Sequence, residues 1–238
     1  MTTHHRLHLS TKPAPRTGFR KPQALAWCLS TLLLLTHGVA MAIEEPAFDR
    51  IEQSEPFEVR QYRSMIVAET FVDAELDQAS NIGFRRIADY IFGNNRSRSG
   101  STENEKIAMT APVTAAPAEK IAMTAPVTIE PQQADASINA KRWRIHFVMP
   151  AQYQLSTLPQ PVNNDVHLRE IPAKRYAVLV FSGFAGQQKV QEKTEELQAW
   201  MRSKKLQAIG APQLARYNPP WTLPFFRRNE ILIEISHP

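Results

Sequence analysis

The order of predicted strands and helices repeats along this chain, and this repeat is the feature that most restricts its fold. Two alternating strands, an amphipathic helix and two further strands occupy residues 57–149, and the same order returns over residues 166–235. Glu58-Val-Arg-Gln-Tyr62 has its counterpart in His167-Leu-Arg-Glu-Ile171. Two such halves can share one core. We therefore expect an α+β fold of duplicated β-α-β-β units that form an antiparallel, distorted β-barrel with two helices.

Both helices are predicted from the spacing of their apolar residues. The first is expected over residues 74–92, with the stripe Leu76, Ala79, Gly83, Ile87, Tyr90 and Ile91. The second is expected from Gln187 to about Leu206, with the stripe Val190, Thr194, Leu197 and Met201. Strands are expected at residues 57–62, 65–71, 143–149, 166–171, 175–182, 214–218 and 230–235. The domain then spans residues 57–238, after an N-terminal extension, 43–56, whose acidic residues 43–55 are predicted to be irregular.

The first 42 residues have the pattern of a cleavable export signal. Basic residues without an acidic one precede an apolar stretch over 24–42. This stretch closes on Ala40-Met41-Ala42, a small-x-small pattern that signal peptidase accepts. The alternative is an uncleaved N-terminal membrane anchor, because a stretch of this length just reaches across a bilayer. Polar residues within the stretch favour cleavage. We expect a periplasmic or secreted protein with no stable membrane insertion afterwards.

Without the leader, the charge and cysteine content of the chain argue against nucleic-acid binding and against any cysteine-based site. Five of the 28 basic residues and none of the 23 acidic ones lie in residues 1–42, so the remainder has a formal net charge of zero. The basic excess of the whole chain therefore does not indicate nucleic-acid binding. The single cysteine, Cys28, also lies in the leader. Residues 43–238 thus carry neither a disulfide nor a thiolate site.

One segment of ten residues occurs twice without a change. Residues 105–114 and 119–128 both read Glu-Lys-Ile-Ala-Met-Thr-Ala-Pro-Val-Thr. Only one copy has to occupy a given strand position, and the other either pairs beside it as a hairpin or forms a surface loop. Pro112 and Pro126 predict strand ends or edge positions, because proline gives the ladder no donor. The sequence leaves open which copy is the structural one.

The repeated segment resembles the signature segment of the SOUL haem-binding-protein family. Further matching segments follow in family order over residues 57–235: Glu58-Val-Arg-Gln-Tyr62, Gly83-Phe84, Tyr90-Ile91-Phe92-Gly93, Phe147-Val-Met-Pro150, Leu158-Pro-Gln-Pro161, Phe181-Ser-Gly-Phe184, Tyr217-Asn-Pro-Pro220 and Arg227-Arg-Asn-Glu230. The family fold is a duplicated β-α-β-β barrel, akin to the gyrase-inhibitor-like effector-binding domains. The resemblance implies non-covalent binding of haem or another tetrapyrrole, without turnover.

The same resemblance implies that the first helix and its nearby loops bind the tetrapyrrole, as they tend to do in family members. Ile82 lies outside the apolar stripe and is flanked by Arg85 and Arg86. An apolar residue amid cations suits a porphyrin ring whose propionates the arginines hold. An ordinary solvated helix face has the same pattern, and that alternative stays open.

The residue that would bind the iron is not settled by the sequence. Some family members carry a histidine, a proposed iron ligand, in the position of Gln61, and glutamine does not replace it. Further candidates for contact with the tetrapyrrole are Tyr62, Tyr90, Met109 and Met123. Each of these also fits ordinary packing in a barrel. His146 alternates with the apolar residues of its strand and is expected to face solvent.

The sequence also bears on two other classes of function. The residues do not predict an enzyme, because no paired nucleophile and base, metal-binding spacing or phosphate loop stands out. The alternative function is an effector-binding or interaction module, in which the barrel cleft holds another amphipathic small molecule or a peptide. Residues 218–226, rich in proline and aromatic side chains, form either one wall of a pocket or a plug over the core.

Overall fold

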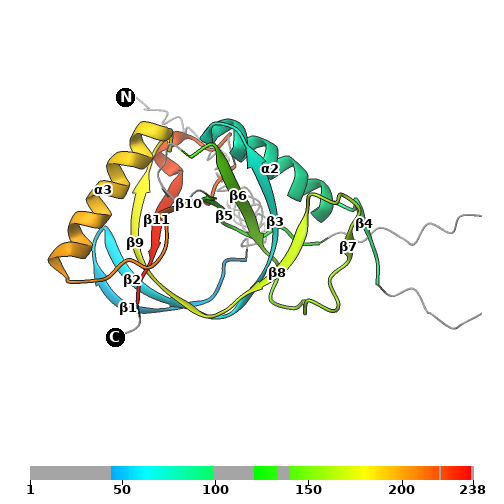
Figure 1. The fold of residues 1–238 in the computed structure, drawn as a ribbon, viewed down its shortest axis with the longest axis horizontal. Helices are drawn as coiled ribbons and strands as arrows, with labels where there is room; N and C mark the ends of the chain where they lie inside the picture. Colours follow the sequence, from blue (N-terminus) through cyan, green and yellow to red (C-terminus); the bar gives the residue numbers. More distant parts are fainter. Residues whose placement is uncertain (1–43, 99–120, 133–139, 220, 237–238) are drawn as a thin grey trace, which may run out of the picture. The chain divides into compact units, whose positions relative to one another are not determined.

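A computed structural model describes residues 44–98, 121–132, 140–219 and 221–236. In these residues a nine-stranded antiparallel sheet curls as a half-barrel and carries two α-helices on its outer face (Figure 1). The sheet strands are β1 (Phe48–Ser54), β2 (Phe57–Tyr62), β3 (Met65–Asp73), β5 (Val127–Pro131), β6 (Arg142–Val148), β8 (His167–Ile171), β9 (Lys174–Ser182), β10 (Gln213–Arg216) and β11 (Arg228–Glu234). The helical elements are α2 (Leu76–Ile91), α3 (Gln187–Ser203) and the 3-10 turn η1 (Pro224–Phe226). The predicted α+β fold is confirmed.

The sheet order makes the internal repeat visible. The strands run β1-β2-β9-β11-β10-β5-β6-β3-β8, so β10 and β5 meet at the junction of two matching halves. The first half is β2, β3, α2, β5 and β6, and the second is β8, β9, α3, β10 and β11. The first strand of each half pairs with the second strand of the other, β2 with β9 and β8 with β3. Because the halves exchange strands in this way, they fold as one sheet.

The core lies between the outer face of the sheet and the two helices. The predicted stripe of α2 is buried, together with Ser80 and Ala88. In α3 the buried residues are the four that the helical period predicted. They pack against strand residues such as Ile129, Ile145 and Ile231, which are completely enclosed. Helical periodicity and strand alternation therefore located this core correctly.

Two segments were predicted wrongly. Residues 48–54, expected to be irregular, form β1 and pair with β2, with Phe48 opposite Tyr62. This strand is at an edge of the sheet and is held by backbone hydrogen bonds, so most of its side chains are exposed and show no alternation. The second is the segment after α2, where no strand was expected. Its first part forms β4 (Asn95–Arg96), which pairs with β7 (Gln160–Pro161).

The second copy of the repeated segment takes part in the sheet. Its residues Ile121 and Ala125 are buried, and Val127 begins β5 directly after Pro126, in agreement with the prediction that this proline marks a strand end. The hydroxyl of Thr124 also donates to the backbone carbonyl of Val148. The first copy, residues 105–114, lies outside the described residues.

Gly83 allows α2 to lie close to the sheet. A Cβ atom there would lie 2.7 Å from Cβ and Cγ1 of Ile145 in β6. We expect Gly83→Ala to lower the free energy of unfolding by about 1–3 kcal/mol through overpacking, despite the better helix propensity of alanine. Urea unfolding followed by circular dichroism measures this. Gly186→Ala, which meets no heavy atom within 4 Å, is the control, and an equal loss in both variants would contradict the close approach.

Candidate functional site

The α2 residues that were predicted to contact the tetrapyrrole point in two different directions. Ile82 is half-buried and packs against the core. The Arg85 side chain is exposed and its Nε donates to the carbonyl of Asn81 at 3.3 Å. Arg86 turns toward the sheet, where Nη1 donates to the carbonyl of Phe71 at 3.1 Å, and its Nη2 is 3.4 Å from a carboxylate oxygen of Asp165. Arg85 is therefore the cation that this part of α2 presents outward.

The other predicted contacts are not gathered in one place. Tyr90 is buried in the core, and its hydroxyl donates to the carbonyl of Pro159 at 2.9 Å. Tyr62 is buried on the opposite face of the sheet, in a separate cluster with Tyr176. Met123 is half-buried against the core. Met109 lies outside the part of the chain that the structure describes.

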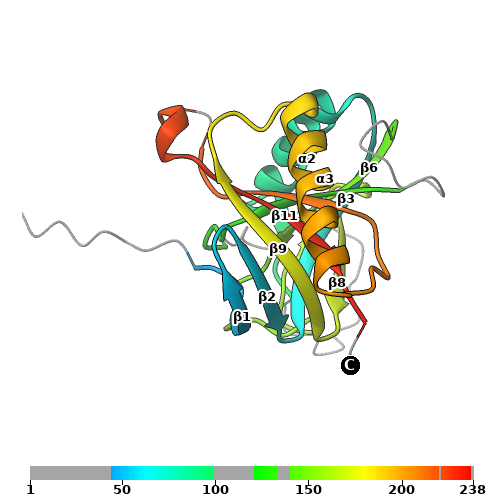
Figure 2. The same cartoon turned by 90° about the vertical axis from the view of Figure 1, so that its left-hand side faces the viewer.

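Two adjoining turns carry a group of exposed apolar side chains, which we call the aromatic surface. Its members and their exposed fractions are Phe184 (65%), Trp221 (82%), Leu223 (56%), Phe225 (65%) and Phe226 (69%). The turns touch where the amide of Gly183 donates to the carbonyl of Pro224 at 3.0 Å. Figure 2 shows η1 projecting from the body of the sheet. The loop that contains η1 therefore does not plug the core, and its large apolar side chains Trp221, Leu223, Phe225 and Phe226 face solvent.

Arg216, at the end of β10, attaches this loop to the rest of the fold. Its Nη2 contacts Asp77 in the first turn of α2 and the carbonyl of Ala185, each at 2.7 Å, and its Nη1 donates to Ser80 at 3.1 Å. The loop thus begins beside the N-terminal turn of α2. A cation also lies at the aromatic surface, because the guanidinium of Arg227 is 4.9 Å from the ring centroid of Phe184.

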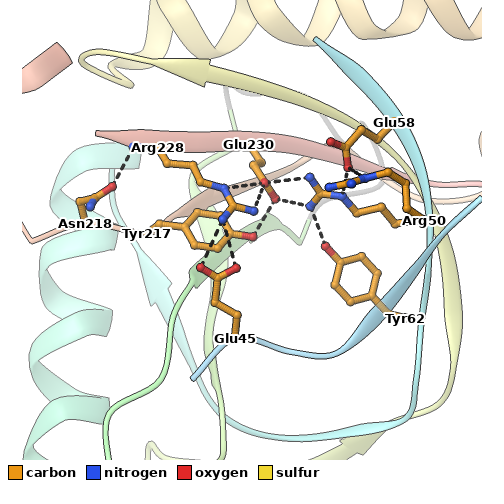
Figure 3. A network of polar contacts seen from close by, with 9 residues as sticks. Glu45, Arg50, Glu58, Tyr62, Tyr217, Asn218, Arg228 and Glu230 are labelled. Atoms are coloured by element: carbon orange, nitrogen blue, oxygen red, sulfur yellow. Dashed lines mark hydrogen bonds and ion pairs between the residues drawn. The ribbon is translucent and has the colours of Figure 1, made fainter. Parts of the chain in front are cut away.

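The face of the sheet turned away from the helices, called the inner face below, contains a buried network of ion pairs (Figure 3). Arg60, only 1% exposed, contacts both oxygens of fully buried Glu230 at 2.9 and 3.1 Å. Its Nε donates to Glu58 at 2.6 Å and its Nη1 to the Tyr62 hydroxyl at 3.1 Å. The Tyr217 hydroxyl donates to Glu230 at 2.7 Å. Burial opposes the charge on Arg60, but Glu230 raises its pKa above the ordinary value.

The network continues toward solvent at both ends. Arg228 binds Glu230 at 2.7 Å and Glu45 at 3.1 Å. At the other end Arg50 binds Glu58 at 3.1 Å. Burial raises the pKa of Glu58, but hydrogen bonds and charges from Arg60 and Arg50 outweigh it and lower the pKa overall. Carboxylates and guanidinium groups alternate along the network, so its charges balance.

This network joins two segments on which the family resemblance rests. Arg60 belongs to the first of them and Glu230 to the last, 170 residues later. Sequence reasoning singled out both segments but did not predict the contact, because no local period connects them. The alternation of β2, which places Glu58, Arg60 and Tyr62 on one face, was the available signal.

His146 corrects another expectation. It lies on the strand face opposite Ile145 and Phe147, as predicted, but it is 6% exposed and does not face solvent. The inner face is shielded because the sheet curls over it. Burial, aided by the charges of Arg169 and Arg144, lowers the pKa of His146 to about 3. The imidazole is therefore neutral at physiological pH.

Comparison with known proteins gives these features a family context. Residues 43–234 match the model of the family described as "SOUL heme-binding protein". The chain belongs to the SOUL heme-binding protein family. It is similar to "Heme-binding protein 2" of Homo sapiens, with 27% identity over 206 residues that cover 84% of this chain and 90% of the human protein. Haem binding is thus the property with which this SOUL protein is associated at the level of its family.

Solved structures resemble this SOUL protein in fold alone. The C-terminal domain of EcmrR superposes with a TM-score of 0.53 and 9% identity, covering 76% of this chain and 98% of that domain. An uncharacterized conserved protein from Listeria innocua gives a TM-score of 0.51 at 11% identity, covering 76% of this chain and 92% of its own. In the described residues no helix is long and apolar enough to cross a bilayer. Nor do they contain a cluster of three or more His, Cys, Asp or Glu suited to a metal ion.

Proposed function

We propose that this protein binds haem or a related tetrapyrrole at its aromatic surface, without covalent attachment and without turnover. The observation that carries the proposal is the aromatic surface itself, with five large apolar side chains more than half exposed on two adjoining turns. Soluble proteins rarely leave a contiguous apolar patch in water unless a ligand or partner covers it. The family and the name of the human relative support the class of ligand.

The chemistry of the surface suits a flat macrocycle that carries carboxylates. Aromatic rings stack against a porphyrin face, and Arg227 supplies a cation beside Phe184 for a propionate. Arg85 on α2 is a second candidate cation. Residues 218–227 contain no His, Met, Cys or Tyr. We therefore infer that ring contacts and propionates, and not an axial bond to iron, contribute most of the binding free energy.

The place of binding follows from the leader. We propose that residues 1–42 export the chain and are removed, so that haem is bound in the periplasm or outside the cell. The support for this is the basic, then apolar, then small-residue pattern of the leader.

We expect Trp221→Ala combined with Phe226→Ala to weaken haemin binding at least about tenfold. Each aromatic side chain buried by the ligand contributes about 1.5–3 kcal/mol, and about 1.4 kcal/mol corresponds to a factor of ten. A Soret-band titration of the full chain measures the haemin affinity. Protoporphyrin IX, followed by fluorescence, should bind within about threefold of haemin, because binding does not depend on an axial bond.

Two variants act as controls for this experiment. Phe92→Ala removes an exposed aromatic residue just after α2 and should leave haemin affinity unchanged. Arg85→Ala with Arg86→Ala tests the first helix. If haemin binding weakens in the Arg85/Arg86 variant but not in the Trp221/Phe226 variant, the haem site lies on the outer face of α2 instead. If haemin shows no saturable binding while an apolar dye binds, the chain is an effector-binding or interaction module for another amphipathic molecule.

A further inference from the structure

Two neighbouring cavities, the smaller of them on the inner face, are separate from the proposed haem surface. The larger has a volume of about 380 Å³ and the smaller about 40 Å³. Pro46, Met65 and Val148 line both cavities and therefore form the wall between them. Apart from this wall, the smaller cavity is lined chiefly by tyrosine and aliphatic side chains.

His146 lines the smaller cavity with an unpartnered nitrogen. Its side chain is buried, and within the described residues its Nδ1 has no hydrogen-bond partner. Nearly all buried polar atoms are paired, and leaving one unpaired costs about 1–3 kcal/mol. This nitrogen thus marks a position where a polar atom of a bound molecule, or a water, completes the cavity.

Residues 44–47 all line the larger cavity, and Pro46 lines the smaller one as well. Hydrogen bonds from backbone amides hold this segment. The carbonyl of Glu44 accepts from the amide of Ala125 at 2.9 Å, and its carboxylate accepts from the amide of Ala151 at 2.8 Å. The carbonyl of Ala47 accepts from the amide of Arg63 at 3.4 Å. Glu45 pairs with Arg228, and both side chains are at least a third exposed. Exposed pairs contribute only about 0–1 kcal/mol. Displacement of Pro46 would open the wall between the two cavities, and the joined space would have the size that small-molecule sites commonly have, about 300–1,000 Å³.

We propose that the inner face holds a binding site for a small, uncharged, planar aromatic molecule with a hydroxyl group, of the phenol class, and that residues 44–47 are its lid. The ligand ring packs among the aromatic and aliphatic walls, and its hydroxyl bonds to His146 Nδ1. This site lies on the opposite face of the sheet from the helices and is independent of the aromatic surface.

The surrounding groups explain this choice of ligand. The rings of Tyr62, Tyr176 and Tyr217 line the cavity. The hydroxyls of Tyr62 and Tyr217 already bond to the ion-pair network, so their rings are what a ligand meets. A charged ligand is disfavoured in the smaller cavity, because Lys174, the charged residue that lines it, is already paired with Glu234 at 2.6 Å. A hydroxyl both donates and accepts, and it therefore satisfies Nδ1 in either imidazole tautomer.

Phenol and toluene, which differ by a hydroxyl in place of a methyl group, test the site. With the full chain, phenol should bind at least about tenfold more tightly than toluene, the factor that a hydrogen bond worth about 1.4 kcal/mol gives. Phenol should also shift the ¹⁵N resonance of the His146 side chain, and toluene should not. In His146→Leu the two affinities should agree within about twofold. Equal affinities in the unmodified chain, or no saturable phenol binding, would overturn the proposal and leave only water in the cavity.

The lid is tested by two matched exposed glutamates. Glu45→Gln removes the pair with Arg228 and should speed phenol exchange up to about fivefold, as NMR line shapes report. Glu52→Gln removes a comparably exposed pair with Lys204 and should leave the exchange rate unchanged. An unchanged rate in Glu45→Gln would refute the lid. Trp221→Ala with Phe226→Ala should not alter phenol affinity, and a loss there would contradict the independence of the two sites.

Discussion

Replacing Arg60 with methionine should lower the free energy of unfolding by about 3–5 kcal/mol, the usual result of removing one partner from a buried ion pair. Methionine keeps much of the volume, so the loss reports the charge. Without the guanidinium, Glu230 retains Arg228 and the Tyr217 hydroxyl, but its two contacts with Arg60 disappear inside the protein. Glu58 also loses its closest cation. Chemical unfolding at pH 7 measures the effect.

Arg50 provides a matched control for this prediction. It binds the same carboxylate, Glu58, but its side chain is 45% exposed. Arg50→Met should therefore cost only about 0–1 kcal/mol. Similar losses in the Arg50 and Arg60 variants would show that burial does not decide the strength of this network.

Lowering the pH from 6.5 to 5 should reduce the free energy of unfolding by about 1.5–2 kcal/mol through His146 alone. The pKa of His146 is about 3 in the folded chain and near 6.5 when unfolded. As the pH falls below 6.5, the unfolded chain takes up a proton that the folded chain does not, so stability is lost. The charged groups near His146 are Arg144, Arg169 and Glu69, and the carboxylate is bound to Arg169.

The range from pH 6.5 to 5 separates the effect of His146 on stability from that of Glu58. The pKa of Glu58 is lowered from 4.5 in the folded chain, so its contribution is lost only at lower pH. His146→Gln should flatten the dependence between pH 6.5 and 5, whatever its effect at pH 7. His167→Gln, at an exposed position, should keep the slope of the unmodified chain. A slope that survives in His146→Gln would show that another group titrates in this window.

The outer face of the sheet could be predicted from the sequence because its signals are local. The stripe Val190, Thr194, Leu197 and Met201 lies within one helix, and all four residues are buried. Alternation likewise placed Ile145 and Phe147 on one face of β6 and His146 on the other. β1 was not predicted because backbone hydrogen bonds hold this edge strand in the sheet, so its side chains show no alternating pattern.

The repeated segment marks one limit of sequence reasoning. Two identical copies have identical propensities, so nothing within them decides which one enters the sheet. In the structure residues 121–128 lead directly into β5, which pairs with β6 and β10. The surroundings of that copy, and not its composition, give it the structural position.

The sequence by itself determined the family, through its ordered matching segments. It also determined the duplicated order of elements and the apolar core under α2 and α3, since short-range periods encode both of these. Only the tertiary structure decided what the inner face contains. Arg60 and Glu230 meet across 170 residues, and His146 is enclosed because the sheet curls. Tertiary structure likewise separated Tyr62 from Tyr90 and exposed Trp221 and Phe226. Such contacts depend on which strands become neighbours, and a local period carries no information about that choice.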